Sequence, residues 1–163
     1  MSWERLIATW FGAGLLRPAP GTWGTLAALP FAWALHLLGG FWLLAVATAA
    51  VFAVGWWVSA RLTGPDDPDP SEIVIDEVAG MWLALWPVSL GAIWADVDVL
   101  WLWPGIVVAF LGFRLFDVWK PGPVGWADRL HSPLGLMLDD ILAGLMAAVM
   151  VIALAALAHG VLM

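Results

Sequence analysis

The sequence predicts an all-α, polytopic helical membrane protein with about five transmembrane helices and a short N-terminal interfacial helix. Hydrophobic residues make up 63% of the 163 residues, charged residues only 12%, and the mean hydropathy is +0.94. Ordinary soluble domains are nearer half apolar, so the excess apolar surface requires lipid. Fourteen Trp and no Tyr give an aromatic content that suits the membrane–water interface. The length is that of a single domain, residues 1–163.

The first predicted element is an amphipathic helix over residues 3–16 that lies in the interface. Its apolar residues recur at helical spacing: Trp3, Leu6, Ile7, Trp10 and Phe11. The start MSWERLIATWF has neither a basic beginning nor an uninterrupted apolar run, so we do not expect a signal peptide. A Pro/Gly-rich loop, RPAPGTWGT, is predicted over residues 17–25.

Five apolar segments follow, each near the roughly 20 helical residues that cross a bilayer. They cover about 22–38, 41–60, 73–95, 99–116 and 138–158. We expect a kink at Pro30 in the first segment, a turn at Gly39-Gly40 after it, and another turn at WADVDV. Polar loops are predicted over residues 61–72 and 117–137.

The basic residues indicate the orientation of these segments. If the chain crosses the membrane at each segment, all six fall on one side: Arg5, Arg17, Arg61, Arg114, Lys120 and Arg129. The positive-inside rule makes that side cytoplasmic. The sequence therefore predicts an odd number of spans, with the N-terminus inside and the C-terminus outside.

Two pairs of acidic residues are the strongest indication of chemistry. Asp76-Glu77 begins the third segment and Asp139-Asp140 begins the fifth, and these segments run in the same direction. A glycine one turn after each pair, Gly80 and Gly144, would allow close helix approach. A solvated helix start stabilised by the helix dipole would explain one pair alone. Two facing pairs would repel, and oxygen-only ligands suit Mg²⁺, so we predict that all four carboxylates bind Mg²⁺.

Basic side chains on the same side of the membrane indicate an anion site. Arg114, Asp117 and Lys120 are spaced three residues apart in FRLFDVWK, and Arg129 follows in the next loop. Arginine binds phosphate oxygens with two donors and lysine supplies a point charge, although both residues also set topology. In PAPGTWGT, Thr22 and Thr25 stand where a helix begins, a position that favours an anion unless Thr22 is a simple N-cap.

Several other classes of site are excluded by the sequence. The chain has no Cys, which excludes a thiolate nucleophile, a disulfide framework and a zinc–thiolate site. No basic patch suggests binding to nucleic acid. The DVDVL segment at 96–100 resembles the Asp-x-Asp of aspartate-nucleophile phosphatases, but it falls in a turn between apolar helices on the opposite side from the other acids.

Three blocks of sequence resemble the phosphatidylglycerophosphatase A family. They are GAGLLRPAPGTWGTLAALP, EIVIDEVAGMW and FRLFDVWKPGPVGWADRLHSPLGLMLDDILAG, in the order found in the family. The resemblance implies a phosphatase of the bacterial inner membrane that hydrolyses the membrane phospholipid phosphatidylglycerophosphate with Mg²⁺ at the cytoplasmic face. It implicates nine of the residues above: Arg17, Thr22, Asp76, Glu77, Arg114, Asp117, Lys120, Asp139 and Asp140.

The predicted reaction is metal-assisted hydrolysis of a phosphate monoester. The four paired carboxylates would hold one or two Mg²⁺ ions, and Arg114 and Lys120 would offset charge on the phosphate. Asp117 would act as a further ligand, as a base, or as a nucleophile that forms an aspartyl-phosphate. The alternative function is a small cation transporter, since carboxylates in membranes also mark ion paths. The almost entirely apolar outer halves of the segments favour the enzyme.

Overall fold

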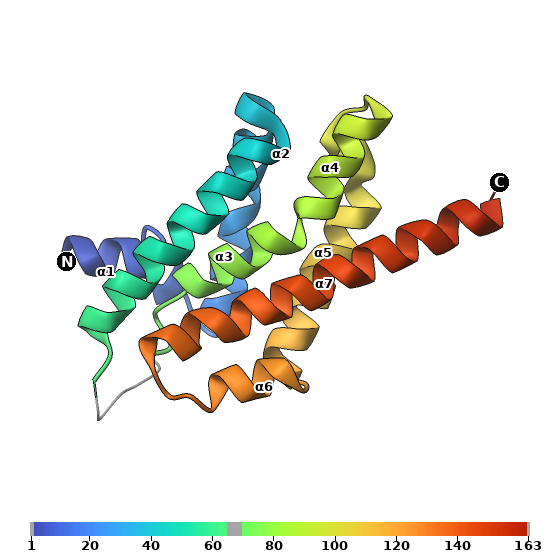
Figure 1. Ribbon diagram of the computed structural model, residues 1–163. Coiled ribbons are helices and arrows are strands. Elements are labelled where there is room, and N and C mark those ends of the chain that lie inside the picture. The colour runs from blue at the N-terminus through green and yellow to red at the C-terminus, as the bar shows by residue number, and fades with distance from the viewer. Residues whose placement is uncertain (1, 65–69, 163) are drawn as a thin grey trace.

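A computed structural model describes residues 2–64 and 70–162 of the chain, and the fold is a bundle of helices (Figure 1). The all-α prediction is confirmed, because the described residues form no strand. The α-helices and the two 3₁₀ turns are α1 (Trp3–Ala8), η1 (Ala13–Leu15), α2 (Pro20–Leu62), α3 (Ile75–Ala84), α4 (Trp86–Ala95), η2 (Val99–Leu102), α5 (Trp103–Trp119), α6 (Pro123–Asp128) and α7 (Pro133–Leu162).

The long apolar helices match the predicted membrane protein. Four helical stretches of the described chain are long and apolar enough to cross a membrane: Pro20–Leu62, Ile75–Ala95, Val99–Trp119 and Pro133–Gly160. The first stretch folds back on itself at Gly39 and Gly40, where the backbone leaves helical geometry (Figure 1). Gly40 has φ 61°, which a residue without a Cβ adopts without strain. Five apolar segments therefore result, as the sequence predicts.

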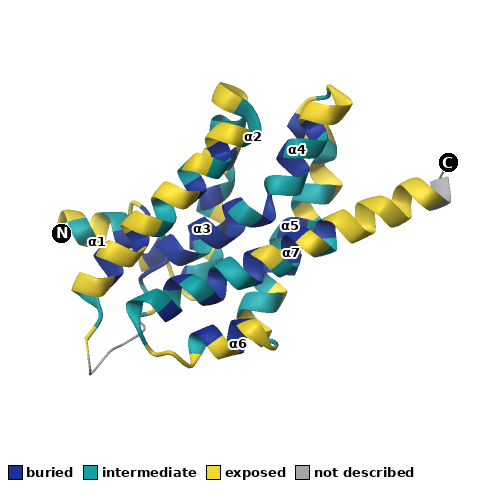
Figure 2. Ribbon diagram, viewed as in Figure 1, coloured by how far each residue is buried: buried dark blue, intermediate teal, exposed yellow. Residues whose placement is uncertain are grey.

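Helix α3 lies at the centre of the bundle. Of its ten residues, only Glu77 and Leu83 are not buried. Helices α2, α5 and α7 surround it, and Figure 2 shows the buried surfaces converging there while the last turns of α7 are exposed. Because α3 carries Asp76 and Glu77 in its first turn, the protein places two carboxylates in its most enclosed element.

Two glycines bring α3 and α7 into close contact. A Cβ atom on Gly80 would lie 2.5 Å from the Asp140 carbonyl oxygen, and one on Gly144 would lie 2.3 Å from the Gly80 carbonyl oxygen. Both distances are too short for any side chain, so the two backbones touch only because these residues are glycine. The predicted role of this pair is confirmed by the geometry.

The N-terminal predictions need correction. The amphipathic helix ends at Ala8 instead of running to residue 16, since Thr9 donates its hydroxyl to the Arg5 carbonyl and accepts from the Gly12 N–H. These bonds fold the chain into a turn. The loop predicted over 17–25 is mostly helix, because Pro20 occupies the first position of α2, where its fixed φ and missing N–H are tolerated. Pro30 lies inside α2 with helical backbone angles.

The later loops also contain more helix than predicted. Helix α5 continues to Trp119, α6 follows, and α7 begins at Pro133, so the segment 117–137 is not a simple loop. Asp139 and Asp140 consequently lie in the second turn of α7 instead of at its start. The third segment is divided at Leu85 into α3 and α4. Residues 65–69 of the predicted loop 61–72 lie outside the described residues.

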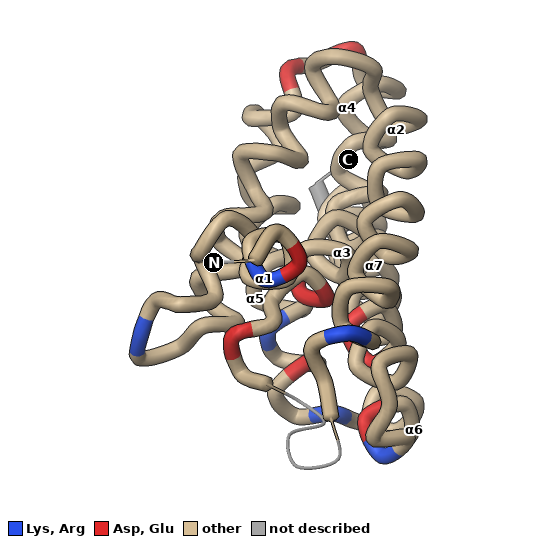
Figure 3. The backbone as a smooth tube through the Cα atoms, turned by 90° about the vertical axis from the view of Figure 1, so that its left-hand side faces the viewer, with Lys and Arg blue, Asp and Glu red and all other residues tan. Residues whose placement is uncertain are grey.

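The charged residues gather at one end of the bundle. Figure 3 shows Lys and Arg confined to the lower half, together with the acidic residues except those in the turn between α4 and η2. This distribution agrees with the prediction that all the basic residues lie on one side of a membrane.

Candidate active site

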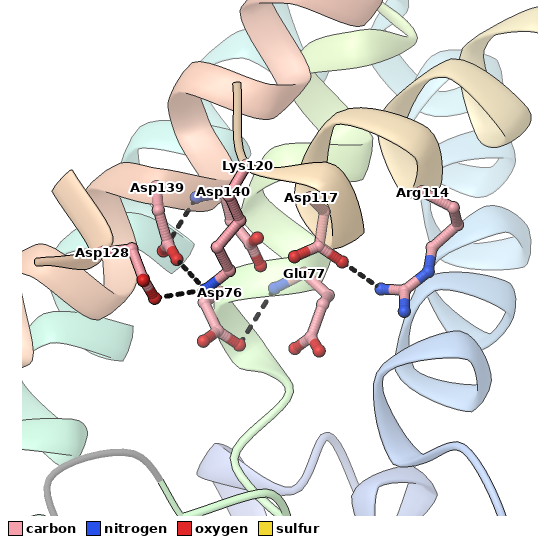
Figure 4. Close-up of polar contacts among 8 residues, drawn as sticks. All are labelled: Asp76, Glu77, Arg114, Asp117, Lys120, Asp128, Asp139 and Asp140. Carbon is pink, nitrogen blue, oxygen red and sulfur yellow. Dashed lines mark hydrogen bonds and ion pairs between the residues drawn. The ribbon is translucent and has the colours of Figure 1, made fainter. Parts of the chain in front are cut away.

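Three carboxylates from two helices meet in the charged half of the bundle. One oxygen from each of Asp76, Glu77 and Asp140 lies within 4.8 Å of the others. Asp76 and Asp140 are only 5% and 3% exposed. Figure 4 shows Asp76 and Glu77 of α3 in one site with Asp139 and Asp140 of α7. A buried group of like charges is costly unless a proton or a cation neutralises it, and carboxylate oxygens are suitable ligands for a hard cation.

The backbone fixes the position of these acids from both helices. The Val74 N–H donates to the Ala8 carbonyl at 2.9 Å, which anchors the start of α3 to the end of α1. The contact between Gly80 and the Asp140 carbonyl holds α7 against α3 one turn later. The aspartate Oδ1 atoms of Asp76 and Asp139 each accept from the N–H of the following residue. These local bonds restrict the side-chain rotamers and leave the second carboxylate oxygen for other partners.

Arg114 brings a positive charge to the opposite wall. It forms an ion pair with Asp117 one turn along α5 (Figure 4). Gly21, in the first turn of α2, lies against both Arg114 and Glu77: a Cβ there would be 2.3 Å from Glu77 Oε1 and 3.2 Å from Arg114 Nη1. The start of α2 therefore approaches the site closely because residue 21 has no side chain.

Lys120 supplies a second cation at the end of α5. Its Nζ atom donates to Asp139 Oδ2 at 2.9 Å and also to Asp128 (Figure 4). Burial lowers the pKa of the Lys120 ammonium, but the bonds to Asp128 and Asp139 outweigh that effect and hold the pKa above its usual value. Lys120 is therefore charged at physiological pH. Its backbone is left-handed, with φ 51°, and α5 ends before Pro121, whose ring would block a further helical turn.

These groups line one cavity of about 330 Å³. Five carboxylates and two cationic side chains face it, so its wall carries a surplus of negative charge. Seven of the predicted site residues meet in this cavity: Asp76, Glu77, Arg114, Asp117, Lys120, Asp139 and Asp140. Asp139 differs from the other three predicted metal ligands in that it is paired with Lys120 instead of joining the closest group of carboxylates.

Four predicted substrate-binding residues do not line the cavity: Arg17, Thr22, Thr25 and Arg129. Arg17 is exposed and donates to the hydroxyl of Ser71, a residue of the cavity wall, at 3.5 Å. Thr25 is buried and donates its hydroxyl to the Gly21 carbonyl at 2.7 Å, so it braces the first turn of α2. Arg129 is exposed at the end of α6. Thr22 is half-buried in the first turn of α2.

Two polar residues of the site, Ser71 and Asp128, are missing from the sequence predictions. Asp128 binds Lys120, and Ser71 lies on the cavity wall. The signal for Asp128 was its place in GWADRL, eight residues after Lys120 and beyond a Pro-Gly-Pro turn that returns the chain to Lys120. Ser71 gave no comparable signal, since it ends a loop with several other polar residues.

Comparison with known proteins shows what kind of protein carries this cavity. The sequence profile described as Phosphatidylglycerophosphatase A matches residues 6–155, which include every residue that lines the cavity. The chain belongs to the phosphatidylglycerophosphatase A family. It is therefore a phosphatase enzyme, and its apolar helices make it a membrane protein. Family membership gives no support to the alternative of a cation transporter.

Individual relatives align over most of their length. The Phosphatidylglycerophosphatase A of Haemophilus influenzae is 35% identical over 151 residues, which cover 91% of this chain and 86% of the relative. The protein of the same name from Escherichia coli is 35% identical over 147 residues, 88% of this chain and 78% of the relative. A Bacteroides thetaiotaomicron protein described as a candidate phosphatidylinositol-3-phosphatase is 36% identical over 150 residues, with 90% and 89% covered. No solved structure matches the chain.

Proposed function

We propose that this member of the phosphatidylglycerophosphatase A family is a Mg²⁺-dependent enzyme that hydrolyses phosphatidylglycerophosphate to phosphatidylglycerol and phosphate. The observation that carries the proposal is the cavity in which Asp76, Glu77 and Asp140 approach within 4.8 Å and face Arg114 and Lys120. Such a site offers oxygen ligands for a divalent cation next to cations for a phosphate. The names of the Haemophilus influenzae and Escherichia coli relatives support this choice of substrate.

The residues fit Mg²⁺ by their chemistry and by one unpartnered atom. Glu77 Oε2 is buried and has no hydrogen-bond partner among the described residues. A buried carboxylate oxygen without a donor is costly, and a cation held with Asp76 and Asp140 would satisfy it. When bound, Mg²⁺ would supply Lewis acidity toward the phosphate and lower the pKa of a coordinated water.

The cationic side chains of the chain bind and orient the phosphate. Arg114 has donors beyond the one that Asp117 accepts, and its planar guanidinium matches two phosphate oxygens. Lys120 donates hydrogen bonds to Asp128 and Asp139, and it can donate to the phosphate in place of Asp139. The Asp139 carboxylate that Lys120 then releases becomes available as a fourth oxygen ligand. Substrate would thus complete the carboxylate set that the sequence predicts.

The proton of the attacking water goes to Asp117 in this proposal. Asp117 lies on α5, across the cavity from the α3 carboxylates, and Arg114 fixes its orientation (Figure 4). Water oxygen bonds to phosphorus, the bond from phosphorus to the glycerol oxygen breaks, and the glycerol oxygen takes up the proton that Asp117 received. In the alternative sequence the Asp117 carboxylate attacks first, which predicts a phosphorylated Asp117 in rapidly quenched samples.

The charge distribution supports a cytoplasmic site in the bacterial inner membrane. All six basic residues belong to the same half of the bundle as the cavity (Figure 3). The positive-inside rule places that half on the cytoplasmic side. A lipid with its headgroup at the cytoplasmic surface would then reach the site from the inner leaflet.

The decisive experiment measures phosphate release from defined lipids by the purified protein in mixed micelles. We expect turnover of phosphatidylglycerophosphate with Mg²⁺ and loss of turnover in chelator, restored by added Mg²⁺. Phosphatidylinositol 3-phosphate is the second substrate to test, because the Bacteroides thetaiotaomicron relative is described by that activity. Equal or faster turnover of the inositol lipid, or turnover that chelator leaves unchanged, would overturn the proposal.

A further inference from the structure

A second cavity lies farther along α2 and α5, two of the helices that also line the active site. Its volume is about 380 Å³, within the range of small-molecule sites. Leu29 and Trp33 of α2 and Ile106 of α5 line it, together with residues of α4 and η2. Apart from one histidine and one serine, all its lining residues are apolar. None of the residues that line it belongs to the active site.

The two polar residues of this cavity satisfy each other. His36 Nδ1 and Ser89 Oγ are 2.8 Å apart, and Ser89 is only 2% exposed. The bond joins α2 to α4, as polar side chains commonly join helices in membranes. The cavity therefore offers apolar contact and no charged group, which suits a hydrocarbon chain and does not suit a headgroup.

The position of the cavity relative to the active site identifies its occupant. On α2, Leu29 follows Gly21 by eight residues, and on α5, Ile106 precedes Arg114 by eight. At 1.5 Å per residue, Leu29 lies about 12 Å along α2 from Gly21, and Ile106 lies about 12 Å along α5 from Arg114. On α5 the partly buried Phe110 lies between the two, at i,i+4 spacing from both Ile106 and Arg114.

We infer that this cavity holds an acyl chain of the lipid substrate while the substrate's phosphate lies among Arg114, Lys120 and the carboxylates. The inference rests on the proposed function, because it takes a phospholipid with a terminal phosphate as the ligand. The glycerol units and the linking phosphodiester span the distance between the two cavities. The chain enters sideways from the lipid between α2 and α5.

The cavity positions the substrate more than it strengthens binding. Bilayer tails are as apolar as the cavity wall, so moving an acyl chain from one to the other changes the free energy little. A chain held between two helices nevertheless fixes the depth and direction of the headgroup. Orientation of this kind raises the rate of the chemical step, because a misplacement of about 1 Å costs up to roughly a hundredfold.

The first test locates the acyl chain directly. Phosphatidylglycerophosphate with a diazirine in one acyl chain is irradiated with the purified protein in chelator, and the adducts are mapped by mass spectrometry. We expect adducts on cavity residues such as Leu29, Trp33 and Ile106. Adducts spread evenly over lipid-facing residues, such as Leu37 and Val107, would overturn the inference. Because this test needs no turnover, it does not depend on catalysis.

The second test fills the cavity. Ala32→Phe adds a ring at a residue that is 3% exposed and lines the cavity. If this variant does not fold, Val88→Phe fills the cavity from α4 instead. We expect turnover of long-chain phosphatidylglycerophosphate to fall about tenfold to a hundredfold. Turnover of a soluble analogue with acetyl groups in place of acyl chains should not change, and the cavity adducts should disappear. Leu37→Phe, at an exposed residue of the same helix, is the matched control.

The outcomes separate this inference from the proposed function. Suppose that the wild-type protein hydrolyses the lipid, but that the filled variants turn over the lipid and the soluble analogue with equal losses, or with no loss of either. The acyl-chain site is then wrong and the proposed function stands. If the wild-type protein hydrolyses no phosphatidylglycerophosphate but the adducts fall in the cavity, the proposed substrate is wrong and the cavity still binds a lipid tail.

Discussion

The carbonyl oxygen of Gly80 occupies the space that a side chain on Gly144 would need. A Cβ atom on Gly144 would lie 2.3 Å from that oxygen, and the Gly80 residue itself contacts the Asp140 backbone. Each carboxylate pair lies within about one turn of this crossing. The distance between the two acidic helices is therefore set by two residues that have no chemistry of their own.

Gly144→Ala should push α3 and α7 apart. Overpacking of this kind costs about 1–3 kcal/mol, so we expect a lower melting temperature and reduced turnover in the same variant. Gly160→Ala, on the same helix with no atom within 4 Å of the added Cβ, is the control and should behave as the wild type. Unchanged melting temperature and turnover in Gly144→Ala would show that the helices adjust and that the crossing does not position the site.

Asp140→Asn and Glu77→Gln should each abolish Mg²⁺-dependent turnover while the protein still inserts. Each change keeps the shape of the side chain and removes a charge from the group of three carboxylates. We expect a loss of at least about a hundredfold in rate. Thermal unfolding with and without Mg²⁺ provides a readout independent of activity, because a cation bound only to the folded protein stabilises it.

In that measurement the wild type should be stabilised by Mg²⁺ and both variants should not. Asp96→Asn, in the turn at the opposite end of the bundle, should keep the stabilisation and the turnover. If Asp140→Asn and Glu77→Gln are stabilised by Mg²⁺ as much as the wild type, the carboxylates bind no catalytic cation.

Lys120→Met should reduce hydrolysis by a few hundredfold. Losing one charge-assisted contact to the transition state costs roughly 2–4 kcal/mol. Arg114→Lys should also be damaging, because an ammonium cannot replace a guanidinium with two aligned donors. Turnover at saturating Mg²⁺ is the measurement, and Arg129→Met, which changes an exposed residue outside the cavity, is the control. Variants of Arg114 and Lys120 that keep more than about half of the wild-type rate would show that these side chains only set topology.

Asp128→Asn should have a smaller effect than Lys120→Met. Asp128 orients the Lys120 ammonium, but its side chain is 40% exposed and the ion pair is partly screened by water. We expect a decrease of about two- to fivefold in turnover. Asp128→Glu should restore most of it, since a carboxylate is again within reach of Lys120. A loss as large as that of Lys120→Met would indicate direct contact between Asp128 and the substrate.

Single cysteines should confirm the orientation, because the chain contains none. Ala95→Cys tests the turn at one end of the bundle, and Gly64→Cys and His131→Cys test the other end; all three residues are exposed. An impermeant thiol reagent applied to intact cells should label only Ala95→Cys. Labelling of His131→Cys from outside would place the active site on the wrong side for the proposed function.

The sequence predicted the spans and the meeting of the acidic residues because each depends on a local pattern. Apolar segments of bilayer length, a Gly-Gly turn and acids one turn before a glycine can all be recognised within a few residues. The approach of α3 and α7 followed from Gly80 and Gly144 for the same reason. These features required no knowledge of how distant segments pack.

The incorrect predictions concern packing and competing hydrogen bonds. The N-terminal helix ends early because the Thr9 hydroxyl and the buried Trp10 ring find partners that helical periodicity does not reveal. Trp10 packs against Trp82, which is distant in sequence. The pairing of Lys120 with Asp128 depends on α6 packing against α7 beside the end of α5, and Gly125 allows this by lying against the Lys120 carbonyl. Sequence periodicity cannot predict a contact of this kind between two separate helices.

If the proposed function holds, the bond between Lys120 and Asp139 links the binding of phosphate to the binding of Mg²⁺. A phosphate that took over the Lys120 donor would free the Asp139 carboxylate, and a cation that bound Asp139 would free Lys120. The two sites are therefore linked thermodynamically, and each ligand must raise the affinity of the other by the same factor. Inorganic phosphate should accordingly become a stronger competitive inhibitor as the Mg²⁺ concentration rises.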